Sequence, residues 1–339
     1  MSRAGITKSD QTNQALTWEP WSPPCPGEIL VRVQACGLNR LDHALSTGAV
    51  SQLSAHGAPY ICGMDAAGTV IAAGDADARF AVGDEVFGHF PAASWAWVQA
   101  PCVRTTADGP HVEHRPVGLD PLAAVALAEA GLTAKTILRA AELQPGQTAL
   151  VIGATFRAGP VLVPLLAEAG TRVIAGATPD EDDYVRSLGA ADTIEYTTVD
   201  PVADALASHP DVDLLVDLIS FDEPYFITAA AAHGTIVTAF PVADEPGISC
   251  IEITAEPGDL AGLAQYARDW RQSVETSCVY RLETVGRSLP ARPRRGAGPR
   301  PRRLRGVAGT LDQPGVREDC LVADGPFRVD FHAARRHRP

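Results

Sequence analysis

The sequence predicts an α/β protein in which a small β-rich domain precedes a doubly wound parallel sheet. Up to about residue 120, short runs of alternating apolar and polar residues are separated by turn residues, which is typical of half-buried strands. Beyond that point apolar strands alternate with helical segments, the pattern of a parallel sheet covered on both faces. The length of 339 residues suits two domains.

The β-rich part contains four expected strands. They lie over residues 27–37, 66–74, 82–88 and 95–98. Gly74-Asp75 supplies the turn after the second of them. Several strands at this close spacing indicate a small barrel or sandwich.

The α/β part opens with a helix over Leu119–Ala141, for which Asp120-Pro121 forms a good N-cap and first helical residue. The strands expected after it cover 148–152, 171–175, 193–196, 213–218 and 235–239, and the helices between them cover 159–169, 182–188, 202–208 and 225–232. This alternation predicts βαβ units.

Composition narrows the functional classes. The formal net charge of −13 argues against nonspecific nucleic-acid binding. The sequence contains no run of about twenty apolar residues, so it predicts no membrane span. Its polar N-terminus lacks the apolar core of a signal peptide. The 7 cysteines are far apart without a C-x-x-C pair, which favours a reducing cytoplasm.

The C-terminal segment 286–339 differs from the rest, with 13 arginines against 5 acidic residues. It is rich in Pro, Arg and Gly and shows neither helical nor strand periodicity. Such a composition predicts disorder, because it buries too little apolar surface to offset chain entropy. An aberrant tail from a shifted reading frame and a basic binding arm are the two interpretations.

A glycine-containing turn, Gly153–Gly159, follows one expected strand and opens the next helix. A dinucleotide fold needs glycines here, because the backbone must approach a pyrophosphate held at the helix N-terminus. A purely structural turn is the alternative. The candidate cofactor-binding residues of this turn are Gly153, Ala154, Thr155, Arg157, Ala158 and Gly159.

The order of several short motifs resembles the medium-chain dehydrogenase/reductase superfamily, and within it the zinc-independent quinone oxidoreductases. The matching pieces are Pro26–Val33, Gly37–Asp42, Pro59–Gly68, Val82–Gly88, Ala130–Ala134, the Gly153–Gly159 turn, Leu188–Asp192 and Val216-Asp217. This resemblance implies a GroES-like domain over 1–120, a Rossmann dinucleotide-binding domain over 121–250, and a return toward the first domain over 251–285.

The resemblance also allows the question of zinc to be argued. Zinc-dependent relatives bind the catalytic ion through a Cys and a His-Glu pair, and here those positions read Asn39 and Met64-Asp65. Amide and thioether groups are poor Zn²⁺ ligands, and one carboxylate does not make a three-ligand site. The segment 88–98 is too short for the relatives' four-cysteine lobe. We therefore expect no metal, and interpret His111 and His114 as two solvated histidines.

The resemblance implies roles for individual residues at the nicotinamide. Asn39 and Thr133 would lie beside it, although Asn39 is also a common turn residue and Thr133 a common helix hydroxyl. Asn39 and Tyr60 are the candidate catalytic residues. Packing against Pro59 is the alternative for Tyr60, and solvent is the alternative proton source.

The choice between NAD and NADP depends on the end of the second strand of the parallel sheet. Residues 175–178 include no acid to bind a ribose 2′-hydroxyl, which favours NADP over NAD. By resemblance, Thr178 and Tyr196 would contact the ribose phosphate. The acids of 180–183 would repel a phosphate if they faced it, but their place at a helix N-terminus also explains them.

Two residues of the glycine turn depart from the family. Phe156 adds a bulky side chain where the phosphates approach, and Pro160 removes a backbone N–H. One lost charged hydrogen bond costs roughly ten- to a hundredfold in affinity.

The sequence therefore predicts a cytoplasmic, zinc-independent NAD(P)H-dependent oxidoreductase that transfers hydride to a quinone or an α,β-unsaturated carbonyl. One alternative is a cofactor-impaired, non-catalytic member or binding module with a basic tail. Another is an enoyl reductase acting on carrier-bound substrates. Relatives commonly pair through the last strand of the dinucleotide sheet, so we expect a homodimer through Thr235–Phe240, with no nucleic-acid or membrane partner.

Overall fold

The computed structural model of the chain contains two compact units. The first comprises residues 1–129 and 260–325, and the second comprises 130–259 and 326–339. Their boundary falls inside helix α2 (Pro121–Ala141), later in the chain than the boundary at 120 expected from the sequence. The structure describes residues 2–8, 14–20, 23–38, 64–74, 79–89, 102–106, 111–156, 158–195, 206–219, 235–238, 248–251, 253–270, 278–281 and 321–324.

The first unit is built on a 7-stranded sheet in the order β14-β15-β3-β4-β5-β7, with β6 also paired to β3. Its long central strand is β3 (Glu28–Leu38), as the alternation of 27–37 predicts. The other strands are β4 (Asp65–Ala73), β5 (Glu85–His89), β6 (Cys102–Thr106), β7 (Val112–His114), β14 (Cys278–Arg281) and β15 (Leu321–Asp324). A separate antiparallel hairpin joins β1 (Ser2–Lys8) and β2 (Gln14–Pro20). The expected strand at 95–98 lies outside the described residues.

Strand β15 comes from the C-terminal segment 286–339. It runs parallel to the second half of β3 and antiparallel to β14. The sequence predicts disorder for the whole segment, and for Leu321–Asp324 the structure differs. These four residues begin with apolar side chains and form backbone hydrogen bonds with the part of β3 that β6 does not pair with. Such a long-range pairing cannot be recognised from local composition.

The second unit contains a 6-stranded parallel sheet in the order β10-β9-β8-β11-β12-β13. The strands are β8 (Thr148–Ile152), β9 (Arg172–Ala177), β10 (Asp192–Glu195), β11 (Leu214–Asp217), β12 (Thr235–Thr238) and β13 (Ile248–Cys250). The strand order reverses between β8 and β11, which is the switch point of a doubly wound fold. The predicted parallel sheet is confirmed.

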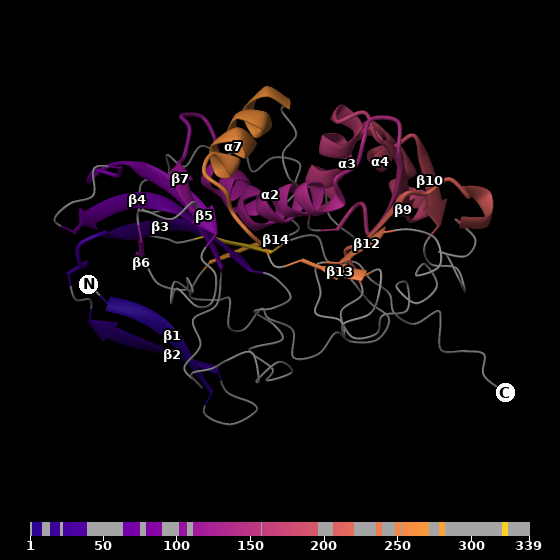
Figure 1. Ribbon diagram of the computed structural model, residues 1–339. Coiled ribbons are helices and arrows are strands. Elements are labelled where there is room, and N and C mark those ends of the chain that lie inside the picture. Colours follow the sequence, from indigo (N-terminus) through magenta and orange to yellow (C-terminus); the bar gives the residue numbers. More distant parts are fainter. Residues whose placement is uncertain are drawn as a thin grey trace. The chain divides into compact units, whose positions relative to one another are not determined.

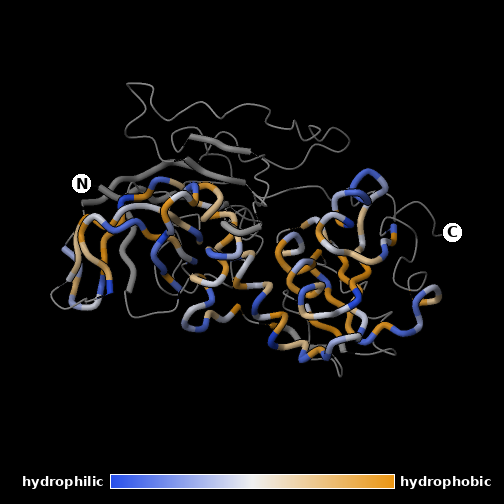
Figure 2. The backbone as a smooth tube through the Cα atoms, turned by 90° about the horizontal axis from the view of Figure 1, so that it is seen from above, coloured by the Kyte–Doolittle hydropathy of each residue, from blue (hydrophilic) through white to orange (hydrophobic). Residues whose placement is uncertain are grey.

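Two of the four helices predicted between these strands are observed, whereas the one expected over 202–208 is described only for 206–208 and the one over 225–232 lies outside the described residues. Helix α3 (Gly159–Glu168) packs against β9, and α4 (Asp182–Ser187) packs against β9 and β10, so that both lie on one side of the sheet (Figure 1). Between β9 and α4 lies the short 3-10 helix η3 (Pro179–Glu181). The hydrophobic stretches of the chain run through the inside of this unit, and hydrophilic stretches lie in its outer turns (Figure 2).

Helix α2 begins as its cap predicts, because the Asp120 carboxylate accepts a hydrogen bond from the Leu122 N–H at 2.9 Å. Among the described residues it is the one helix long and apolar enough to span a membrane. However, 67% of that stretch is buried within the structure, which is typical of a core helix.

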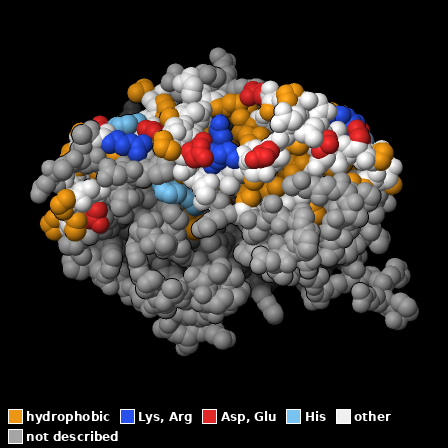
Figure 3. All heavy atoms as spheres, viewed as in Figure 1, with side chains coloured by type: hydrophobic (Ala, Val, Ile, Leu, Met, Phe, Trp, Pro, Cys, Tyr) orange, Lys and Arg blue, Asp and Glu red, His pale blue; other side chains and the backbone are white. Residues whose placement is uncertain are grey.

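On the face shown in Figure 3, acidic and basic side chains lie interspersed with apolar ones.

The predicted dimer edge needs correction. Strand β12 covers the first four residues of the expected edge Thr235–Phe240, and the last two lie outside the described residues. It is not the last strand of the sheet, because β13 pairs with it in parallel through Val237 and Ser249. Among the described strands, the outermost one at this end of the sheet is therefore β13, a strand that local patterning does not predict.

Phe156 packs into the core of the second unit. Its side chain is 5% exposed, and it belongs to a cluster with Leu150, Ile152, Ile174, Val212, Leu215, Ile219 and Ile236. Leu150 lies in register with Ile174 on one side and Leu215 on the other, so these side chains form a row across the sheet. The bulk that Phe156 was expected to add where the phosphates approach is therefore directed into the core, because burying an aromatic ring in this row is more favourable than exposing it.

A buried polar cluster lies in the sheet of the first unit. The His89 ring Nδ1 lies 2.9 Å from an Asp65 carboxylate oxygen, and both side chains are buried. The backbone N–H of His89 donates to the His111 carbonyl at 3.0 Å. The His111 Nδ1 atom is also buried and has no hydrogen-bond partner among the described residues.

The two histidines interpreted as solvated therefore differ. His114 is exposed, with its Nε2 3.1 Å from the Arg79 carbonyl. His111 instead lies partly buried beside His89, because strand β7 brings it against β5. Burial lowers the pKa of His111, and the neighbouring His89 lowers it further.

We expect Phe156→Ala to lower the free energy of unfolding by about 3–5 kcal/mol, because it leaves a cavity in the sheet core. Urea unfolding of the full chain measures this. The control is Val117→Ala at a position that is 98% exposed, where we expect a change within about 0.5 kcal/mol. Equal stability of the two variants would contradict the burial of Phe156.

The lowered pKa of His111 predicts that the folded chain loses stability in acid. Because its pKa is lower in the folded chain than in the unfolded chain, the unfolded state binds more protons between the two values. The stabilisation is present above the ordinary histidine pKa of about 6.5 and is lost as the pH falls through the folded value. Between pH 8 and pH 5, the free energy of unfolding should fall less steeply for His111→Gln than for the parent chain. His114→Gln, at the exposed position, should behave like the parent.

Candidate functional site

The turn between β8 and α3 is closed by its own backbone. Gly153 has φ +84°, a conformation that favours glycine. The Phe156 N–H donates to the Gly153 carbonyl at 2.8 Å, and the Gly159 N–H donates to the Phe156 carbonyl at 2.8 Å. The turn is therefore tight from the end of the strand to the start of the helix.

Two glycines make this closure possible. A Cβ at Gly153 would lie 2.5 Å from the Ile219 Cγ2 atom, and a Cβ at Gly159 would lie 2.3 Å from the Ala154 carbonyl oxygen. The contact at Gly159 is with backbone, which has no rotamer by which to move away. A side chain at Gly159 would thus push the helix start away from the strand end, whereas one at Gly153 would meet the Ile219 side chain and require a strained backbone conformation.

The turn leaves two main-chain donors available. The N–H groups of Gly159, Val161 and Leu162 have carbonyl acceptors within the turn and the helix start. Those of Thr155 and Ala158 make no hydrogen bond to another described residue. Free N–H groups at a helix N-terminus bind anions. Of the other candidates here, Ala154 is buried with its N–H 3.3 Å from the Gly176 carbonyl, and Arg157 lies outside the described residues.

Asp217, which the sequence offers only as part of the Val216-Asp217 motif, positions the chain beside the glycine turn. It ends β11 in register with Ile152, is fully buried, and accepts a hydrogen bond from the Ile219 N–H at 3.0 Å. This bond fixes the chain where the Ile219 side chain meets Gly153. An acid at the end of an otherwise apolar strand is the sequence signal that could have identified it.

Thr133 has a buried hydroxyl without a partner. The residue lies in α2 and is 5% exposed, and its Oγ1 makes no hydrogen bond to any described residue. A buried, unpaired hydroxyl is unfavourable unless it serves another group. The expected contact of Thr133 with a cofactor, which would supply this partner, stays a prediction.

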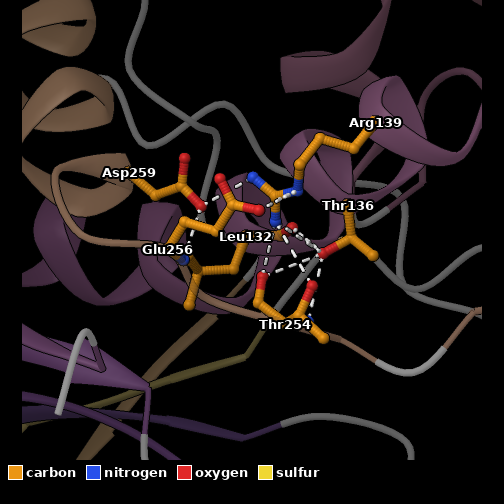
Figure 4. Close-up of polar contacts among 6 residues, drawn as sticks. All are labelled: Leu132, Thr136, Arg139, Thr254, Glu256 and Asp259. Atoms are coloured by element: carbon orange, nitrogen blue, oxygen red, sulfur yellow. Dashed lines mark hydrogen bonds and ion pairs between the residues drawn. The ribbon is translucent and has the colours of Figure 1, made fainter. Parts of the chain in front are cut away.

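Thr136, one turn further along α2, has a structural role instead. Its hydroxyl accepts from the Thr254 N–H at 3.1 Å and lies 2.8 Å from the Leu132 carbonyl (Figure 4). Arg139 extends this contact, donating to the Thr254 carbonyl at 2.8 Å and to the Asp259 carboxylate at 2.9 Å. These bonds hold the segment 253–259 against α2.

At the carboxyl end of β9, Thr178 is engaged by carboxylates. Its hydroxyl lies 2.7 Å from both an Asp180 oxygen and a Glu181 oxygen, and its N–H donates to the same Glu181 oxygen at 3.0 Å. This is a capping box at the start of η3. The predicted contact of Thr178 with a phosphate does not fit this arrangement, because acidic groups already accept from its donors. Tyr196 lies outside the described residues.

The position that holds zinc in some relatives contains Met64 and Asp65. Met64 is buried, and Asp65 is paired with His89. Asn39 and Tyr60, the candidate catalytic residues, lie outside the described residues. Within the described ranges no three metal-ligating side chains come together.

Comparison with known proteins agrees with this geometry. The model of the alcohol dehydrogenase GroES-like domain matches residues 25–141. The chain is 28% identical over 232 residues to the chloroplastic quinone-oxidoreductase QR1 of Triphysaria versicolor, covering 66% of this chain and 69% of that protein. It is 27% identical over 246 residues to the mouse mitochondrial NAD(P)H oxidoreductase RTN4IP1, covering 63% of this chain and 59% of that protein.

Solved structures share the fold over nearly the whole chain. A quinone oxidoreductase from Coxiella burnetii superposes with a TM-score of 0.75 at 20% identity, covering 95% of this chain and 98% of that one. The CurK enoyl reductase gives 0.70 at 18% identity, covering 95% and 99%. Mycobacterial Rv1454c, solved with NADPH, gives 0.70 at 19%, covering 85% and 95%. In its GroES-like domain, its quinone-oxidoreductase relatives and its doubly wound sheet, the chain resembles the quinone oxidoreductases of the medium-chain dehydrogenase/reductase superfamily.

Proposed function

We propose that the chain is a zinc-independent, NAD(P)H-dependent reductase of quinones or α,β-unsaturated carbonyls. The observation that carries this proposal is the turn between β8 and α3. It keeps two glycines where no side chain fits, leaves the Thr155 and Ala158 N–H groups available, and turns the Phe156 ring into the core. A nucleotide pyrophosphate is the anion that such a turn accommodates.

The chain's own residues would bind and orient the cofactor. Thr155 and Ala158 would donate main-chain N–H groups to the pyrophosphate, and the Thr133 hydroxyl would gain the partner that it lacks. When bound, the reduced nicotinamide supplies a hydride to an electron-poor carbon. Asn39 and Tyr60 stay candidates for the groups that orient the acceptor, with solvent as the alternative proton source.

The zinc-independent assignment rests on the donor atoms at the family's zinc position. The Met64 thioether is a poor Zn²⁺ ligand, and the Asp65 carboxylate is already bonded to His89 inside the sheet. The substrate class rests on the relatives, whose names include quinone oxidoreductases. A cytoplasmic location and a homodimer stay predictions.

The preference for NADPH that the sequence favours rests on the absence of an acid at 175–178, with Thr178 and Tyr196 as the implied contacts of the ribose phosphate. The carboxylates on Thr178 do not support that role. The complex of Rv1454c with NADPH shows that cofactor in a protein of the same fold, but at 19% identity it does not decide the choice here.

The first test is cofactor binding by the glycine turn. We expect Gly159→Ala to abolish saturable quenching of protein fluorescence by NADH and NADPH, because the added Cβ meets the Ala154 carbonyl. The matched control is Gly262→Ala in helix α7 (Asp259–Trp270), where nothing lies within 4 Å of the added Cβ. The control should bind as the parent does and gain up to about 1 kcal/mol of stability. Parent-like binding by a folded Gly159→Ala variant would contradict the proposal.

Thr133 and Thr136 give a second, paired test. Thr133→Val removes a hydroxyl that has no partner, so we expect unchanged or slightly higher stability but cofactor affinity weakened by up to about tenfold. Thr136→Val breaks the bonds to Thr254 and should cost about 1–3 kcal/mol of unfolding free energy. Thermal unfolding and cofactor titration distinguish the two effects. A Thr133→Val variant that is destabilised and binds normally would assign Thr133 a purely structural role.

A further inference from the structure

We infer that this chain selects NADH over NADPH, and that Glu181 is the residue that determines the choice. The inference rests on the proposed function, since it concerns the same nucleotide site. It reverses the cofactor preference that the sequence indicates.

The first step is the place of Glu181 in the fold. In a doubly wound sheet, the adenosine ribose lies at the carboxyl end of the second strand, where an acid binds the 2′-hydroxyl of NAD. That strand is β9, which ends at Ala177 and is followed directly by Thr178. The η3 turn brings the Glu181 carboxylate back onto the N–H and hydroxyl of Thr178, at 3.0 and 2.7 Å. An acid four residues beyond the strand is thereby held at the strand's end.

The second step is the binding capacity that remains there. Only one oxygen of the Glu181 carboxylate, Oε2, bonds to Thr178. The other oxygen makes no hydrogen bond to a described residue, so it can accept from a ribose hydroxyl. The Thr178 hydroxyl has a single proton, which is directed to the carboxylates of Asp180 and Glu181. A phosphate would find acceptors rather than donors at this position.

The third step is the surrounding charge. Residues 178–195 contain six acids and one base, Arg186. The Arg186 guanidinium is already bound to Asp182 at 2.8 Å and lies 3.6 Å from Asp192. Hydrogen bonds from Thr193 and Arg186 lower the pKa of Asp182, so this carboxyl stays ionised at neutral pH. Residues 178–195 thus offer no free cation for a 2′-phosphate, which carries about −1.5 to −2 charges at pH 7.

The capping role of Glu181 is compatible with this function. The capping box alone would explain why the residue lies on Thr178, but it would make the stability of η3 the only property that depends on Glu181. Selectivity makes a different prediction: the ratio of the two dissociation constants depends on the charge of residue 181. This ratio is a readout that a merely structural role does not move.

The experiment is titration of the full chain with NADH and NADPH, followed by protein fluorescence or calorimetry. We expect NADH to bind at least about tenfold more tightly, the effect of one repelled pair of like charges. Glu181→Gln keeps an oxygen acceptor for Thr178 and removes the charge, so the ratio should shift toward NADPH by about tenfold. The control is Glu168→Gln, which removes one charge at the exposed end of α3, before β9 begins, and should leave the ratio unchanged.

The outcomes separate this inference from the proposal on which it rests. Equal or tighter binding of NADPH by the parent would overturn the selectivity and leave the reductase assignment intact. A Glu181→Gln variant that weakens both cofactors equally, or that binds both as the parent does, would overturn the role of Glu181. Absence of saturable binding of either cofactor would overturn the proposed function and this inference with it.

Discussion

The site depends on one packing interaction, the burial of the Phe156 ring in the sheet of the second unit. The ring lies among side chains of β8, β9, β11 and β12, and its carbonyl accepts the Gly159 N–H. The packing of the Phe156 ring therefore fixes the middle of the turn against the sheet, while the two glycines allow the ends of the turn to approach each other. Phe156 is bulky for a turn that is proposed to bind a pyrophosphate, yet it gives the turn its shape, because its ring is directed into the sheet core.

The same turn is supported from the neighbouring strand at the switch point. Asp217 is buried at the end of β11 and binds the Ile219 N–H, and Ile219 in turn contacts Gly153. A buried carboxylate is costly unless hydrogen bonds satisfy it. Its position is understandable when it fixes a loop that must approach a backbone closely. Hydrophobic packing below the turn and a polar contact beside it thus act on the same few atoms.

Much of the fold follows from local pattern, whereas the details of the site depend on contacts that are distant in sequence. The parallel order, the Asp120 cap and the place of the glycine turn are visible in the sequence because periodicity and capping are local properties. The direction of the Phe156 ring depends on Ile236 and Leu215, far along the chain. The pairings of β13 and β15 are likewise long-range, so a short apolar run alone did not predict them.

Glu181 shows why a motif counted by spacing can miss a functional group. An acid is sought at the end of the second strand, and residues 175–178 have none, yet η3 folds the carboxylate back to that point. Because this carboxylate also caps η3, a lysine in its place would lose the hydrogen bonds with both donors of Thr178. Cofactor choice and the start of the helical segment after β9 are therefore coupled in this chain. A full reversal of selectivity, beyond the shift expected for Glu181→Gln, would require the turn to be rebuilt as well as the charge reversed, since both depend on the same carboxylate.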